Sequence, residues 1–231
     1  MRLDKILSAS GVGTRSEVKK YIKKGAVTIN EKVILDDGYI VNELTDHIVC
    51  NGQKVFYQKY HYYMLNKPSG YVTSTKDASV TVMSLIKEFP KFKLNPVGRL
   101  DKDTEGLLII TDDGELTHRL TSPKKHIPKT YYVETKNVVS PCDIERLEDG
   151  VTLDDGYLTL PSKVDKIGDK VVNLTIYEGK YHQVKRMFEA LDNKVTYLKR
   201  IKVNNLQLDS SLKIGEYKEL TTEELEQLVK S

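Results

Sequence analysis

One aspartate stands between two cations at the start of an apolar run in VGRLDKDTEGLLIITDDGEL, residues 97–116. Asp101 follows Arg99 and precedes Lys102, and the apolar residues 107–110 are expected to form a buried strand. A carboxylate at that place is partly removed from water, so it needs a cationic partner to stay ionised. Asp101 is therefore either a structural residue that caps a turn or a reactive carboxylate, and Arg99 is a nearby candidate partner.

Three further segments carry residue types that could assist such a carboxylate. KTYYV, residues 129–133, directs two tyrosines to opposite faces of a strand, so one can enter the core while the other faces a cleft. MLNKPSGYVTST, residues 64–75, presents Lys67 in a Pro-Gly turn. EGKYHQVKRMF, residues 178–188, continues from a glycine turn into a helix whose first turns carry Gln183, Lys185 and Arg186. A carboxylate, a stacking ring and a cation suffice for nucleophilic chemistry on a flipped-out base.

The composition is typical of a globular protein that lies outside membranes. The chain has 231 residues, of which 39% are hydrophobic and 30% charged, enough for one ordinary domain and a small one. No window approaches 18 consecutive apolar residues, and the N-terminus is charged where a signal peptide is apolar, so we expect a cytoplasmic protein. The two cysteines lie far apart and the five histidines lack ligand spacing, so we expect neither a metal nor a cofactor.

The first 58 residues have the pattern of a small helical unit with hairpins. Thr14 begins a capping-box pattern, TRSE, that opens a helix ended by Gly25, and AVTIN alternates like a strand. A second strand pair is expected around Asn51 and Gly52. Basic residues outnumber acidic ones in residues 1–32 and again in residues 180–202, which favours a polyanionic partner. One face of the predicted helix carries four lysines: Lys19, Lys20, Lys23 and Lys24. This face either is simply exposed to solvent or binds RNA.

This unit resembles the S4 RNA-binding domain over about its first 45 residues. The likeness is carried by RLDKILSASGVGTRSEVKKYIKKGAVTINEK, residues 2–32, with its Arg-Leu-Asp opening and Gly-x-Val-x-Ile-Asn strand. The resemblance implies that the unit grips structured RNA, mostly through phosphates. The residues it assigns to that contact are Arg2, Lys5, Arg15, Lys19, Lys20, Lys23 and Lys24.

The remainder is predicted to be a second domain, residues 60–231, after a first domain of residues 1–58. Strand-like and helix-like runs alternate irregularly, which favours an α+β class with a largely antiparallel sheet. The expected strands are residues 62–65, 107–111, 129–135 and 171–177. The expected helices are residues 80–89, 115–121, 141–150 and 182–191, with a last helix that begins at Thr221.

The second domain resembles the pseudouridine synthases, within them the S4-domain group that acts on one ribosomal RNA uridine. Four motifs occur in the family's order: NKPSGYVTST, GRLDKDTEGLLIITDDGELTHRLTSP, KTYYV and EGKYHQVKRMF. The likeness is nearest to enzymes of small-subunit (16S) RNA. It implies a mixed sheet flanked by helices, a basic cleft, no cofactor, and ribosomal RNA or a pre-ribosomal small-subunit particle as partner. We expect a monomer.

The resemblance also assigns roles to individual residues. It makes Asp101 the catalytic aspartate, Tyr131 the stacking tyrosine and Lys185 the basic residue, with Arg186 as the fallback for Lys185. Asp101 would add to the sugar or the base, or support a glycal intermediate. The predicted substrate-binding residues are Arg99, Leu100, Gln183, Arg186 and Lys67. The alternatives are a large-subunit RNA enzyme of the same group and a non-catalytic S4-type assembly factor.

Overall fold

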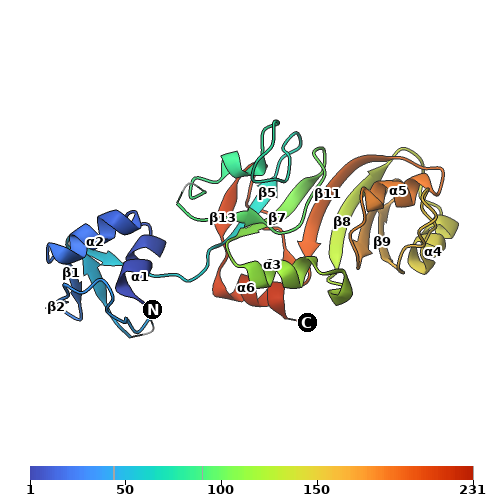
Figure 1. Cartoon of the computed structure of the whole chain (residues 1–231). Helices are drawn as coiled ribbons and strands as arrows, with labels where there is room; N and C mark the ends of the chain where they lie inside the picture. Colours follow the sequence, from blue (N-terminus) through green and yellow to red (C-terminus); the bar gives the residue numbers. More distant parts are fainter. Residues whose placement is uncertain (44, 90, 231) are drawn as a thin grey trace. The chain divides into compact units, whose positions relative to one another are not determined.

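The computed structural model describes residues 1–43, 45–89 and 91–230 and divides into two compact units (Figure 1). The first unit is Met1–His61 with Pro90–Lys93, and the second is Tyr62–Phe89 with Leu94–Ser231. The last residue of the predicted second domain, 231, lies outside the described residues. Each unit has its own core and is described by itself.

The first unit packs two helices, α1 (Leu3–Ala9) and α2 (Arg15–Lys23), on a four-stranded antiparallel sheet. Thr14 caps α2 with the predicted capping box, since its hydroxyl accepts from the Glu17 backbone while the Glu17 carboxylate accepts from Thr14. Asn51 and Gly52 both adopt positive φ in the predicted hairpin turn. The strand order is β2-β1-β3-β4, with β1 Val27–Ile29, β2 Lys32–Val33, β3 Ile48–Cys50 and β4 Gln53–Val55.

The second unit is built on one mixed sheet of nine strands in the order β13-β5-β7-β11-β8-β10-β9, with β12 and β6 at its side. Among the described pairs only β7 with β11 is parallel, which confirms the predicted α+β class with a largely antiparallel sheet. The strands are β5 Tyr62–Lys67, β6 Asn95–Pro96, β7 Glu105–Thr111, β8 Lys129–Thr135, β9 Lys163–Gly168, β10 Val171–Ile176, β11 Val195–Val203, β12 Leu206–Gln207 and β13 Tyr217–Glu219.

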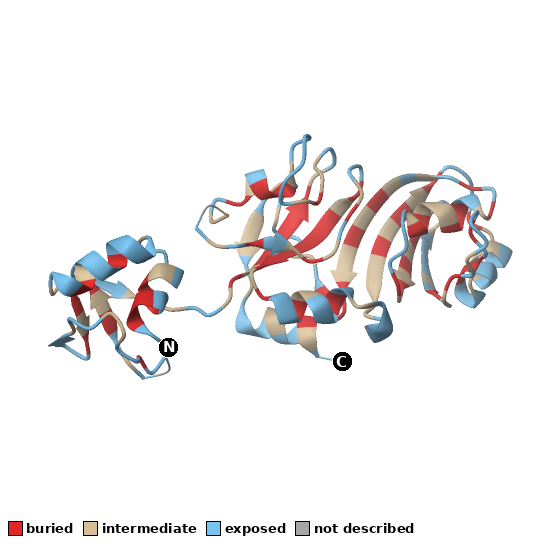
Figure 2. Ribbon diagram, in the orientation of Figure 1, coloured by how far each residue is buried: buried red, intermediate tan, exposed pale blue. Residues whose placement is uncertain are grey.

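The helices of this unit lie against the sheet, whose central strands are the most buried part of the ribbon (Figure 2). The α-helices are α3 Gly114–Thr121, α4 Pro141–Asp149, α5 Gln183–Glu189 and α6 Thr222–Val229, close to four of the predicted ones. The short 3-10 helices are η1 Val82–Leu85 and η2 Pro123–Lys125. In the described part of the chain, every helix is too short or too polar to cross a bilayer.

The predicted helix at residues 80–89 is wrong, because only the turn η1 forms there. The Val72 N–H donates to the carbonyl of Val80 at 3.0 Å, and the Val82 N–H donates to the carbonyl of Val72 at 3.0 Å. These bonds hold residues 80–82 in an extended conformation beside Val72, as an isolated parallel β-bridge. The β-branched side chains at 80–82 favour that extended backbone over a helix.

The parallel contact between β7 and β11 depends on a glycine. Gly106 has a φ of +101°, and a Cβ built there would lie 2.2 Å from the carbonyl oxygen of Arg200. Only a residue without a side chain permits that approach. The contact brings β11 against the strand that follows Asp101.

Candidate active site

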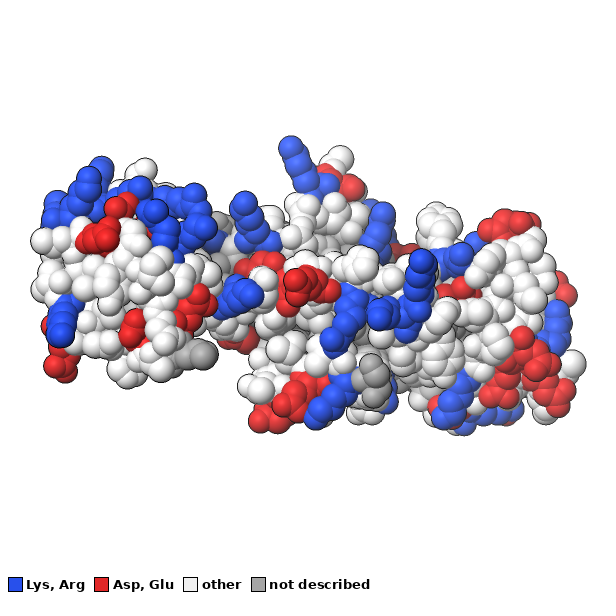
Figure 3. All heavy atoms as spheres, turned by 60° about the horizontal axis from the view of Figure 1, so that its bottom comes forward, with Lys and Arg blue, Asp and Glu red and all other residues white. Residues whose placement is uncertain are grey.

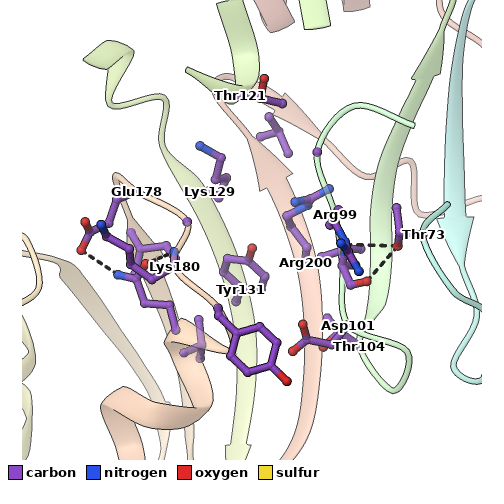
Figure 4. Close-up of a pocket in the computed structure, with 18 of the residues that line it drawn as sticks. Thr73, Arg99, Asp101, Thr104, Thr121, Lys129, Tyr131, Glu178, Lys180 and Arg200 are labelled. Atoms are coloured by element: carbon purple, nitrogen blue, oxygen red, sulfur yellow. Dashed lines mark hydrogen bonds between the residues drawn. The ribbon is translucent and has the colours of Figure 1, made fainter. Parts of the chain in front are cut away.

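A cavity of about 670 Å³ lies in the second unit, with its wall formed by segments far apart in the sequence. Strands β8 and β11 supply one wall, and the loop at residues 97–104, here the Asp101 loop, supplies another. Residues 72–73, 120–123 and 176–184 and Ile109 complete the lining. Figure 4 shows Asp101, Tyr131, Lys129 and Arg200 directed towards this space. The structure therefore brings together the aspartate and the tyrosine that were separate motifs in the sequence.

Asp101 is paired with Lys185 of helix α5 and lies beside the imidazole of His182 at the N-terminal end of that helix. Its side chain is 27% exposed, and the two carboxylate oxygens lie 3.2 Å from the Lys185 Nζ and 3.6 Å from the His182 Nε2. Lys185 also donates to Asp103 at 2.6 Å. Burial lowers the pKa of Lys185, but its bonds to Asp103 and Asp101 outweigh that effect, so the pKa is raised above its ordinary value. Lys185 therefore stays charged beside Asp101.

Arg99 is not the cation paired with Asp101 in the described structure. Its side chain is exposed and lies on the cavity wall, while the ion pairs of Asp101 run to Lys185 and His182. Leu100 also lines the cavity, and its backbone N–H and C=O are both bonded to the buried Thr73 hydroxyl, at 3.2 and 2.8 Å. The partner of Asp101 is thus a cation that only the fold brings close, rather than Arg99.

Lys67, predicted to bind substrate, does not reach the cavity. Its side chain is fully buried, and Nζ donates to three carbonyl oxygens: Pro68 at 3.0 Å, Lys102 at 3.2 Å and Thr104 at 2.7 Å. An ammonium has three donors, so these bonds leave none for a ligand. Lys67 instead fastens the Asp101 loop to the end of β5.

The buried ammonium of Lys67 makes stability depend on pH. Burial lowers its pKa to about 8, whereas an unfolded lysine keeps its proton to about pH 10. Above pH 8 the folded state binds fewer protons than the unfolded state, so the free energy of unfolding rises with pH. Urea unfolding of the wild type should gain about 1 kcal/mol more between pH 7 and 9 than Lys67→Met does. Equal gains would contradict this account.

Arg186, the fallback cation, is directed away from Asp101. Its Nε donates to Asp154 at 2.5 Å, and one Nη lies 2.7 Å from the Asp155 carboxylate. These two carboxylates raise the pKa of Arg186, Asp155 first. Arg186 is absent from the cavity lining, so neither its fallback role nor its predicted substrate contact fits the structure.

Gln183 does line the cavity, but its amide is already bonded. It is 4% exposed, its nitrogen donates to Glu178 at 2.9 Å, and its oxygen accepts from the backbone of Lys180 at 2.8 Å. Glu178 in turn accepts from the Tyr157 hydroxyl at 2.7 Å and from the Leu160 N–H at 3.0 Å. This network shapes the wall at residues 178–183.

The two tyrosines of KTYYV face opposite sides of β8, as predicted. Tyr131 is buried and lines the cavity. Tyr132 packs edge-on against Tyr197, with ring centroids 6.1 Å apart, and donates to Glu134 at 3.1 Å. Tyr131 is therefore the ring that can contact a bound base.

Sequence reasoning missed several residues of the cavity. Tyr181 and His182 stand immediately before Gln183 in an already quoted motif and stack with ring centroids 3.8 Å apart. His182 has a φ of +47°, a rare backbone conformation for a residue with a side chain. Lys129 opens the KTYYV motif, which was a usable signal. Arg200 had no signal in the sequence, because only strand pairing places it beside Tyr131.

The basic residues of the first unit divide into paired and unpaired ones. Arg2 bonds to Asp4 at 3.0 Å, and Lys19 lies 2.9 Å from Asp37, so both are held by carboxylates. Blue side chains gather along one side of this unit (Figure 3). Of the residues predicted to contact RNA, those that are exposed and have no ion pair in the described structure are Lys5, Arg15, Lys20, Lys23 and Lys24.

A metal site is not indicated in the part of the chain that the structure describes. No group of three or more His, Cys, Asp or Glu side chains there has the arrangement of metal ligands. Cys50 is buried and Cys142 exposed, and both are free.

Comparisons with known proteins agree with this geometry. Residues 61–190 match the RNA pseudouridylate synthase family, and residues 1–48 match the S4 domain. An uncharacterized RNA pseudouridine synthase of Bacillus subtilis (strain 168) is 48% identical over 97% of both chains. Ribosomal small subunit pseudouridine synthase A of Haemophilus influenzae is 40% identical over the full length of both.

A solved structure supports the same assignment. A crystal structure of a pseudouridylate synthase superposes with a TM-score of 0.71 at 41% identity, covering 99% of this chain and 100% of that one. The family match covers more than half of the sequence, and the fold and the motifs agree with it. The chain belongs to the RNA pseudouridylate synthase family and carries an S4 domain at its N-terminus.

Proposed function

We propose that this enzyme isomerises one specific uridine to pseudouridine in small-subunit (16S) ribosomal RNA. The observation that carries the proposal is Asp101, held at the cavity wall by Lys185 and facing the space beside Tyr131. The full-length likeness to a small-subunit pseudouridine synthase supports the choice of RNA. A pure RNA binder has no chemical use for a carboxylate in a basic cleft, so the arrangement favours an enzyme.

The proposed roles follow from the contacts. Asp101 engages the ribosyl-uracil, either by adding to the sugar or base or by supporting a glycal intermediate. Lys185 holds the Asp101 carboxylate in position through its opposite charge. Tyr131 packs on the uracil face and shields the reacting centre from water. Arg99 and Leu100 would contact the flipped-out nucleotide from the Asp101 loop.

Isomerisation leaves the composition of the nucleotide unchanged, so the demands on the protein are positional. The uracil detaches from C1′, rotates and rejoins through C5, and it must not diffuse away in between. The cavity walls would meet that demand by holding the detached base and limiting its contact with water.

Release of tritium from RNA labelled at uridine C5 tests the proposed reaction. Small-subunit and large-subunit RNA are compared, each bare and partly assembled with ribosomal proteins. Release from small-subunit RNA alone supports the proposal. Release from large-subunit RNA would show that large-subunit RNA is the substrate instead. No release from any RNA would leave a non-catalytic S4-type assembly factor.

The proposal also covers the form of the substrate, the oligomeric state of the enzyme and its location. We propose that the enzyme acts as a monomer on ribosomal RNA or on a pre-ribosomal small-subunit particle in the cytoplasm. The comparison of bare with partly assembled RNA separates the two substrate forms.

The unpaired lysines of α2 are proposed to contact RNA phosphates. Lys20→Gln with Lys24→Gln removes two charges that no carboxylate of the described residues pairs with, so RNA affinity should fall about tenfold and the dependence on salt should weaken. The slope of log K against log salt should lose about 1.5, measured by filter binding over a salt series. Lys32→Gln with Lys54→Gln, on the sheet of the same unit, is the matched control. Equal effects of both pairs would contradict a specific α2 surface.

A further inference from the structure

Arg200 carries a buried charge without a carboxylate partner in the described structure. Its side chain is 5% exposed in the cavity wall, and Nε donates to the carbonyl of Leu107 at 2.8 Å. No carboxylate of the described residues lies within ion-pair distance of it. A guanidinium stays charged at any pH that a protein meets, and a buried charge without a counterion is costly. Such a residue is poised for an anion that arrives with the substrate.

Lys129 is a second cation of the same wall. Its Nζ donates only to the carbonyl of Ile127, at 2.7 Å, and no carboxylate is paired with it among the described residues. Burial, and then the charge of Arg200, lowers the pKa of Lys129 to about 8. Lys129 and Arg200 line the same cavity.

The carboxylates of the cavity wall are already used elsewhere. Among the described lining residues they are Asp101, paired with Lys185, and Glu178, bonded to Tyr157, Leu160 and Gln183. The end of the cavity at Arg200 and Lys129 is therefore net positive. The printed contacts of these two cations are to backbone carbonyls, and no carboxylate among the described residues balances their charge.

Strand pairing places both cations around the ring of Tyr131. Arg200 is the direct partner of Tyr131 across β8 and β11, so their side chains share one face of the sheet. Lys129 is two residues before Tyr131 on β8 and also faces the cavity (Figure 4). A base stacked on Tyr131 would present its edge to these two cations.

We propose that Arg200, assisted by Lys129, stabilises the negative charge of the uracil while it is detached from the ribose. This inference rests on the proposed function. When the N1–C1′ bond breaks, its electron pair stays with uracil, and the charge spreads over N1, O2 and O4. The carboxylate of Asp101 compensates for the electron deficit that this cleavage leaves on the sugar. The C5–C1′ bond then forms, C5 loses its proton, and N1 gains one, so the composition is conserved.

The charge on uracil exists only after bond cleavage begins, so stabilising it lowers the barrier rather than strengthening substrate binding. A backbone phosphate is the competing anion. Exposed Arg99 and Lys102 on the Asp101 loop are better placed for phosphates, because the RNA backbone remains in solvent. The buried position of Arg200 beside Tyr131 favours the base.

Single-turnover kinetics on RNA with uridine or 5-fluorouridine at the target position tests this role. Fluorine withdraws electrons and stabilises the uracil anion by itself, so it should compensate for a missing cation. Arg200→Met is expected to slow loss of the N-linked uridine about 100-fold, and to slow loss of 5-fluorouridine about tenfold or less. RNA affinity should change less than about threefold. Arg200→Lys should fall between wild type and Arg200→Met.

The melting temperature of Arg200→Met shows whether this variant is folded. If it folds poorly, two further variants still test the proposal. Lys129→Met, whose side chain is less buried, should show a smaller defect with the same relief by fluorine. Lys102→Met should weaken RNA binding and act equally on both substrates. Equal slowing of both substrates, a loss confined to affinity, or unchanged rates would overturn the role of Arg200. A wild type inactive on every RNA would instead refute the proposed function.

Discussion

Asp101→Asn is expected to lower pseudouridine formation at least about 1,000-fold while RNA affinity changes less than about threefold. Asparagine has nearly the same shape, so the Asp101 loop should keep its bonds to Lys67 and Thr73, which involve other residues of the loop. The loss would therefore be chemical. Tritium release gives the rate, and filter binding gives the affinity.

Asp103→Asn is the matched control, because the same lysine also bonds Asp103, at 2.6 Å. The Asp103 side chain is 71% exposed. Burial raises the pKa of Asp103, but the hydrogen bond of Lys185 and its charge outweigh that effect and leave the pKa below its ordinary value. Asp103→Asn should lower the rate less than about tenfold, since the side chain at position 103 faces solvent rather than the cavity. Appreciable turnover by Asp101→Asn would refute the catalytic assignment and make Asp101 a structural turn residue.

Lys185→Met and Arg186→Met, adjacent in sequence, are expected to differ sharply. Removal of Lys185 leaves Asp101 without the ammonium at 3.2 Å, so the rate should fall about 100-fold. Tritium release by both variants measures the two rates.

Arg186→Met should keep nearly the full rate, because its guanidinium bonds Asp154 and Asp155 outside the cavity. Surface ion pairs contribute about 0–1 kcal/mol, so stability should change little as well. Similar losses in the two variants would indicate that α5 needs positive charge in general rather than a cation at Asp101. A loss only in Arg186→Met would reverse the assignment.

The local structure was largely predictable because its causes lie within a few residues. The capping box at Thr14 and the turn at Asn51 are set by side chains beside the backbone they stabilise. Strand β8 at residues 129–135 was predicted at its observed bounds from alternation alone. The helix predicted at residues 80–89 failed, because Val72 competes for its backbone hydrogen bonds across a turn.

The candidate site was only partly predictable. The motifs singled out Asp101, Tyr131 and Lys185, since a carboxylate, a ring and a cation are recognisable by type. Motif membership could not separate a cavity residue from one that supports it. Lys67 is in a motif, yet its ammonium donates its hydrogen bonds to backbone carbonyls and not to a ligand. A motif thus marks the neighbourhood of a site rather than the role of each residue.

The sequence alone determined the two-part organisation and the residue types available for chemistry, because these depend on local pattern and composition, and its motifs carried the resemblance to the family. Tertiary structure alone decided which residues meet. Lys185 and Arg186 differ by about 100° around their helix, so the docking of α5 selects the partner of Asp101. Arg200 reaches Tyr131 through strand pairing across 69 positions of the chain. Long-range contacts of this kind have no local cause, so only the folded chain reveals them.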